Sequence, residues 1–124
     1  MDLRVPPGSA AAKIRPVIRY LGCLPSACPA RYAQASPITA VDKSDAPLLI
    51  VNGTQEIVPL PQAQSMANRL KKAHVPYKLI VVQGARHARG YRKIVWAPTL
   101  KFLEKYLGHL PVQDFTPPRR VRAR

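Results

Sequence analysis

Two short apolar runs separated by an amphipathic segment constrain the fold of this chain most strongly. Leu48-Leu49-Ile50-Val51 is a continuous apolar run that ends at Asn52-Gly53, and residues 77–82 form a second run. Such runs are typical of strands buried on both faces, and therefore of parallel strands. Between them, residues 61–73 carry apolar side chains at helical spacing. The order strand, helix, strand predicts a right-handed βαβ unit.

Further elements are expected on both sides of this unit. Residues 83–91 form a polar loop, and residues 97–107 predict a second helix with Leu100, Leu103 and Leu107 on one face. A short helix is expected over residues 14–21, with Pro16 as its first helical residue. Residues 22–46, interrupted by three prolines, are expected to be a long loop. The predicted fold class is α/β, a βαβα unit preceded by a short helix and a long loop.

Two parallel strands with so few helices leave open edges and uncovered apolar surface, so the unit is expected to be part of a larger sheet. We expect residues 1–110 to be one partial domain and residues 111–124 to be a basic, disordered tail.

Polar residues follow both predicted strands. Gly53-Thr54-Gln55-Glu56 follows the first strand, and Gly84-Ala85-Arg86-His87 follows the second. Because functional side chains collect at the carboxyl ends of parallel strands, these two loops are the candidate site.

Several of these segments together resemble the C-terminal third of α/β-hydrolase esterases and lipases. The segments are residues 35–38, 46–54, 57–60 and 74–87, and the resemblance covers roughly residues 13–109. It is closest to the prolyl oligopeptidase-like (peptidase S9-like) and feruloyl esterase-like branch. The resemblance implies the terminal βαβα portion of an α/β-hydrolase sheet and hydrolysis of an ester or peptide substrate by a serine, acid, histidine triad.

The resemblance also implies roles for three residues. His87 matches the triad histidine, whose imidazole takes the serine proton and returns it to the leaving group. Counting back from Val58-Pro59 places Gln55 at the acid position, and Glu56 could replace it if the loop shifts by one residue. A glutamine there would be costly, because changing the triad aspartate to asparagine lowers turnover by about 10⁴.

The nucleophile of this family has no counterpart in the chain. No G-x-S-x-G occurs, the His-Gly-Gly oxyanion segment is absent, and no serine is on a strand-to-helix turn. The serines are Ser9, Ser26, Ser36, Ser44 and Ser65. The expectation is a truncated serine hydrolase that is inactive alone, since nucleophilic attack and oxyanion stabilisation would both be lost.

The charge of the chain raises an alternative function. The chain has 20 Lys and Arg against 6 Asp and Glu, a net charge of +14, which favours polyanion binding. Local support comes from Arg86, Arg89, Arg92 and Lys93 and from the tail, but the excess charge is otherwise spread along the chain. The aromatic residues are scattered, so a nucleic-acid partner is not expected. Another alternative is a docking subunit that completes a split hydrolase, with the edge of the Leu48–Val51 strand joining a separate N-terminal hydrolase fragment.

Cysteine and histidine spacing gives no metal or cofactor site. Cys23 and Cys28, at C-x4-C spacing, could close a small disulfide loop inherited from an exported parent. His74, His87 and His109 lack the spacing of zinc ligands. No apolar run approaches a membrane span, and no secretion signal is recognisable, so we expect this chain to be cytoplasmic.

Overall fold

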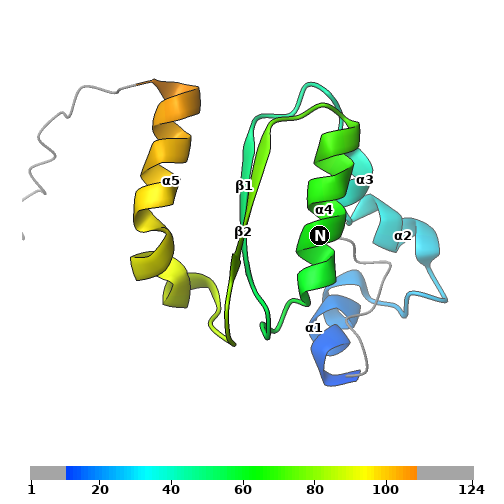
Figure 1. The fold of residues 1–124 in the computed structure, drawn as a ribbon. Helices are drawn as coiled ribbons and strands as arrows, with labels where there is room; N and C mark the ends of the chain where they lie inside the picture. The colour runs from blue at the N-terminus through cyan, green and yellow to red at the C-terminus, as the bar shows by residue number, and fades with distance from the viewer. Residues whose placement is uncertain (1–10, 109–124) are drawn as a thin grey trace, which may run out of the picture.

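The structure is a computed structural model that describes residues 11–108 of the chain. These residues form three layers, with a two-stranded sheet between helix α5 on one face and helix α4 on the other (Figure 1). Three further helices, α1 to α3, lie on the α4 side. The predicted tail at residues 111–124, Ser9 and His109 lie outside the described residues.

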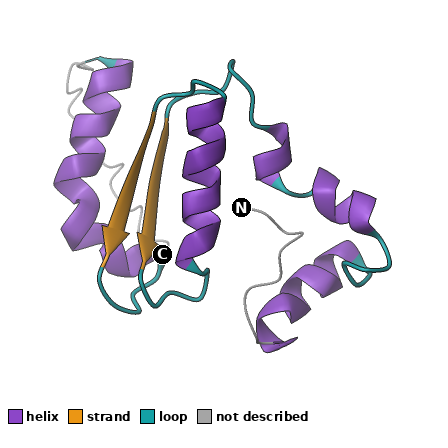
Figure 2. Ribbon diagram, turned by 45° about the vertical axis from the view of Figure 1, so that its right-hand side comes forward, coloured by secondary structure: helices purple, strands orange, loops and turns teal. Residues whose placement is uncertain are grey.

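The sheet confirms the predicted parallel pair. Strand β1 (Leu48–Gly53) pairs with β2 (Tyr77–Val82) in a register that runs from Leu48 opposite Tyr77 to Gly53 opposite Val82. Both strands point the same way, so the loops after them meet at one end of the sheet (Figure 2). Asn52 and Gly53, at which the apolar run ends, belong to β1, and both are buried.

Helix α4 (Leu60–Lys72) is the crossover between the strands, and it carries the main core. Its apolar stripe packs against the segment that precedes β1 and against the residues that lead into β2. Leu70, only 2% exposed, lies at the centre of this cluster. The other members are Met66, Ile38, Val41 and Val75. The predicted amphipathic helix is therefore confirmed.

The expectation of a long structureless loop over residues 22–46 is wrong. Two short helices, α2 (Pro29–Gln34) and α3 (Pro37–Ala40), occupy part of it. Each begins with one of the prolines that interrupt this segment, because proline has no N–H to leave unsatisfied in the first turn and its φ suits a helix.

The segment around α2 is anchored by a disulfide and a buried tyrosine. Cys23 and Cys28 are disulfide-bonded, with their Cα atoms 6.3 Å apart. The Tyr32 side chain is fully buried, and its hydroxyl donates to the Cys23 carbonyl over 2.8 Å. Arg31 Nη1 donates to the Leu21 carbonyl over 2.8 Å. These bonds connect α2 to the end of α1.

The two outer helices both begin earlier than predicted. Helix α1 (Ala11–Leu21) contains Pro16 in its interior, and α5 (Arg92–Leu107) contains Pro98 in the same way. Placing Pro16 at the start of the helix is therefore wrong. An interior proline removes one backbone hydrogen bond and can kink a helix, but in both helices the helical conformation continues on either side of it.

Helix α5 is only loosely attached to the sheet. None of its residues is buried, and the three leucines of its predicted apolar face are 41%, 44% and 65% exposed. Among residues 11–108, no helix is long and apolar enough to cross a lipid bilayer.

Candidate functional site

The loops that follow β1 and β2 are joined by backbone hydrogen bonds. Thr54 N–H donates to the Val82 carbonyl over 2.9 Å, and Gln55 N–H donates to the Gly84 carbonyl over 3.1 Å. In return, Gly84 N–H donates to Thr54 Oγ1 over 3.0 Å. Parallel pairing thus continues beyond the strands and fixes the position of one loop relative to the other.

At this end of the sheet, Glu56 and His87 lie in contact. Glu56 Oε1 is 2.5 Å from His87 Nδ1, although 31 residues separate them in the sequence. The Glu56 side chain is 5% exposed, whereas that of His87 is 52% exposed. The carboxylate is therefore enclosed by protein, while half of the imidazole faces solvent.

The structure brings Glu56, and not Gln55, to the histidine. After β1 the chain turns at Thr54 and Gln55, so Gln55 is exposed. The side chain of the next residue folds back to the end of the strand, where Glu56 Oε2 accepts the Gly53 N–H over 3.0 Å. Of the two residues predicted for the acid position, Glu56 is therefore the one that contacts the histidine.

A residue that the sequence did not single out completes the cluster. The hydroxyl of Tyr91 donates to Glu56 Oε2, and Tyr91 is only 5% exposed. It reaches the carboxylate because a 3₁₀ turn, η1 (Ala88–Tyr91), follows the histidine directly. Its only signal in the sequence is weak, a large ring in an otherwise polar loop.

Burial and hydrogen bonding shift the pKa of Glu56 in opposite directions. Burial raises the pKa of the carboxyl, but hydrogen bonds from Tyr91, Gly53 N–H and His87 outweigh burial and lower it. Glu56 is therefore ionised at neutral pH. Burial, together with the bond to this carboxylate, raises the pKa of Tyr91 to about 12, so the tyrosine stays a donor.

The ionised carboxylate determines which nitrogen of His87 carries a proton. A carboxylate can only accept hydrogen bonds, so the neutral imidazole carries its proton on Nδ1 and leaves Nε2 as the acceptor. A buried carboxylate in this position orients the ring and stabilises the imidazolium that forms when Nε2 takes a proton. The cluster has the geometry of an acid and base pair for general-base catalysis.

No nucleophile or metal site accompanies this pair in the described part of the chain. Among residues 11–108, no serine is hydrogen-bonded to His87, and Ser36, the most buried serine, donates to the Tyr32 carbonyl over 2.7 Å. The same residues contain no group of three or more His, Cys, Asp or Glu side chains that could hold a metal ion.

Comparison with known proteins gives one family. Residues 17–110, about three quarters of the chain, match the model of the prolyl oligopeptidase family. Neither the curated proteins nor the solved structures gave a match.

Proposed function

Because the chain belongs to the prolyl oligopeptidase family, we propose that Glu56 and His87 are the acid and the base of a serine hydrolase that cleaves an ester or peptide bond. The observation that carries this proposal is the 2.5 Å contact between Glu56 Oε1 and His87 Nδ1 at the carboxyl ends of two parallel strands. Active-site residues of α/β folds collect at this end of the sheet.

In the proposed reaction, His87 Nε2 takes the proton of a serine hydroxyl as the serine oxygen attacks the carbonyl carbon. Glu56 stabilises the resulting imidazolium, and Nε2 then gives the proton to the leaving alcohol or amine. Water repeats the cycle and releases the acid and the serine. The 124 residues contain no G-x-S-x-G, so the proposal requires a serine and oxyanion donors from outside this segment.

A fluorophosphonate probe, which labels activated serines, tests the proposal. The chain would be purified with a tag from the cells that encode it, so that any polypeptide joined to it or bound to it is retained. We expect a labelled serine in that material, lost in His87→Ala and strongly reduced in Glu56→Gln. His74→Ala, which changes an exposed histidine outside the site, is the matched control and should leave labelling intact. Labelling that is absent, or unchanged in His87→Ala, would contradict the proposal.

A second proposal concerns how the missing parts reach His87. We propose that the open edge of β1 pairs with a strand of the rest of the hydrolase, carried by the same polypeptide or by a separate one. Only β2 pairs with β1 among the described residues. A hollow of about 320 Å³ lies along the β1 side chains and α4, lined by residues 48–52 and by Val58 and Met66.

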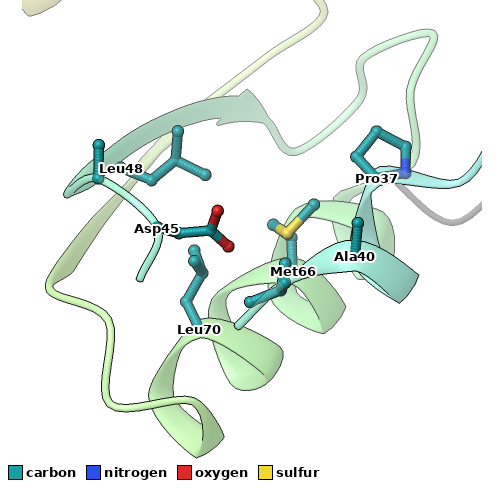
Figure 3. A pocket seen from close by; sticks show the side chains of 8 residues that line it. Pro37, Ala40, Asp45, Leu48, Met66 and Leu70 are labelled. Atoms are coloured by element: carbon teal, nitrogen blue, oxygen red, sulfur yellow. The ribbon is translucent and has the colours of Figure 1, made fainter. Parts of the chain in front are cut away.

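A second hollow, of about 410 Å³, continues past the start of β1 and shares Leu48 and Met66 with the first (Figure 3). Pro37 and Ala40 of α3 line its other side. The side chains around it are mostly apolar, apart from the Asp45 carboxylate. Apolar hollows beside an unpaired strand edge are the features that strand addition uses.

Co-purification with an N-terminal hydrolase fragment tests the separate-chain form. Leu48→Asp changes a side chain that is 39% exposed at the β1 edge and should abolish the association. Leu107→Asp, at a leucine 65% exposed on the far helix α5, is the control and should leave it unchanged. Equal association of the two variants would exclude the β1 edge as the contact.

A further inference from the structure

A third hollow lies at the opposite end of the sheet from His87. It is formed between the start of β2 and the last turns of α5, and its volume is about 300 Å³. β2 is six residues long, so the two ends of this strand are roughly 17 Å apart. The hollow is therefore separate from the Glu56 and His87 cluster.

Lysines and aromatic rings alternate around this hollow. Its lining residues are Tyr77, Lys78, Lys101, Phe102, Lys105 and Tyr106. Tyr77 also packs against the core cluster beside α4, so the two rings that α5 brings to the hollow are Phe102 and Tyr106. Phe102 and Tyr106 are half-buried and the three lysines are exposed, so these two rings form the floor and ammonium groups form the rim.

Two contacts join the α5 side chains that line the hollow. Phe102 and Tyr106 pack with ring centroids 4.8 Å apart at a tilt of 55°. The Lys105 ammonium lies 5.0 Å from the centroid of the Tyr106 ring, where a cation is attracted to the ring electrons. Within the described part of the chain, no acidic side chain lines the hollow, so those residues do not neutralise its positive charge.

We propose that this hollow binds a nucleoside phosphate, either free or as a unit of single-stranded nucleic acid. A flat base stacks on aromatic side chains, and ammonium groups pair with a phosphate, so this ligand uses both kinds of lining residue. A phosphate without a ring would not use the floor, and a neutral ring would not need three cations. The volume of this hollow lies at the lower end of the range for small-ligand sites, which is roughly 300 to 1,000 Å³.

Titration of the ¹⁵N-labelled full chain with 5′-AMP, followed by NMR, tests the proposal. We expect shifts in the amides of residues 77–78 and 101–106 and affinity at least about tenfold tighter than for ribose 5-phosphate or adenosine, each of which has half of the recognised groups. Ribose 5-phosphate that binds as tightly as 5′-AMP would show attraction by charge alone and would overturn the proposal. So would the absence of shifts at these residues.

Two variants with a matched control separate the site from the general positive charge of the chain. The double variant Lys101→Gln and Lys105→Gln should weaken 5′-AMP binding by about tenfold or more. Lys71→Gln with Lys72→Gln removes the same charge from exposed positions on α4 and should leave binding unchanged. Tyr106→Leu should weaken binding by loss of stacking, and the lysine pair carries the test if this variant does not fold. Equal weakening by the two lysine pairs would overturn the proposal.

A single-stranded ten-nucleotide DNA distinguishes the two sources of the ligand. Tighter binding of the oligonucleotide than of 5′-AMP, with the same amides shifted and a steep loss in added salt, would identify nucleic acid as the source. Equal affinity per site would identify the free nucleotide.

Discussion

Gly53 lies so close to Tyr91 that a Cβ atom on the glycine would be 2.8 Å from the tyrosine hydroxyl oxygen. The same Cβ would be 2.8 Å from the Gly84 carbonyl oxygen, which accepts the Gln55 N–H. The absence of a side chain at the last residue of β1 therefore lets the two loops and Tyr91 close around Glu56.

Gly53→Ala should disrupt this arrangement. The added methyl group must displace backbone, because the Gly84 carbonyl is not at the end of a flexible side chain. We expect a loss of about 1 to 3 kcal/mol in the free energy of unfolding, measured by urea denaturation. Gly90→Ala is the comparison, since its nearest atom is Arg86 Cβ at 3.3 Å, and it should cost less. A Gly53→Ala protein as stable as wild type would show that the loops are less tightly fixed than described.

Tyr91→Phe should change the ionisation of Glu56 while keeping the ring. The hydroxyl donates to the Glu56 carboxylate, so its removal raises the pKa of that carboxyl. Stability at pH 7 should fall by about 1 to 3 kcal/mol, because the buried carboxylate loses a donor. Carboxyl ¹³C NMR measures the first effect and urea denaturation the second. Tyr20→Phe, at a tyrosine 84% exposed, should change neither.

The pH dependence of stability follows from the lowered pKa of Glu56. The folded pKa lies below the ordinary value of 4.5, so the stabilisation is fully present above pH 4.5 and is lost as pH falls through the folded pKa. Glu56→Gln should therefore flatten this part of the pH profile. The flattening is only partial, because hydrogen bonds from Ser44 also lower the pKa of Asp42. Glu104→Gln, on the exposed face of α5, is the matched control. A Glu56→Gln profile that keeps the wild-type slope would contradict this assignment.

Reduction of the Cys23 and Cys28 disulfide should destabilise one region selectively. The bond closes a loop between residues five apart, and chain entropy predicts about 2 kcal/mol for a loop of this size. Dithiothreitol should speed amide exchange in α2 and leave the strands protected. A Cys23→Ala and Cys28→Ala protein should show no response to dithiothreitol. Equal loss of protection in β1 and β2 would show that the disulfide stabilises the whole fold.

The sequence predicted the parts of the fold that periodicity encodes. Residues 77–82 were assigned as a strand with the bounds observed, and the α4 stripe predicted the main core. Periodicity could not predict α2 and α3, since six and four residues are too few to show it. The prediction that Pro16 begins the first helix was wrong, since α1 continues through this residue.

For the candidate site, the sequence predicted the histidine and two alternatives for the acid. The choice between Gln55 and Glu56 depends on a turn of one residue, which no spacing in a single sequence determines. The role of Tyr91 could not be predicted, because its contact with Glu56 spans 35 residues and exists only once the two strands pair. The lysine and aromatic hollow was missed for the same reason, since it joins residues from β2 and α5.

The strand register that places Gly53 opposite Val82 limits where residues can be inserted into this chain or deleted from it. A slip of one residue between the strands moves one loop by about 3.3 Å relative to the other, enough to separate Glu56 from His87. Deletions at residues 54–56 should therefore abolish the contact. The turn between α4 and β2, at residues 73–76, is at the far end of the sheet, but it holds Val75 in the main core, so insertions there should cost stability without acting on the loops directly.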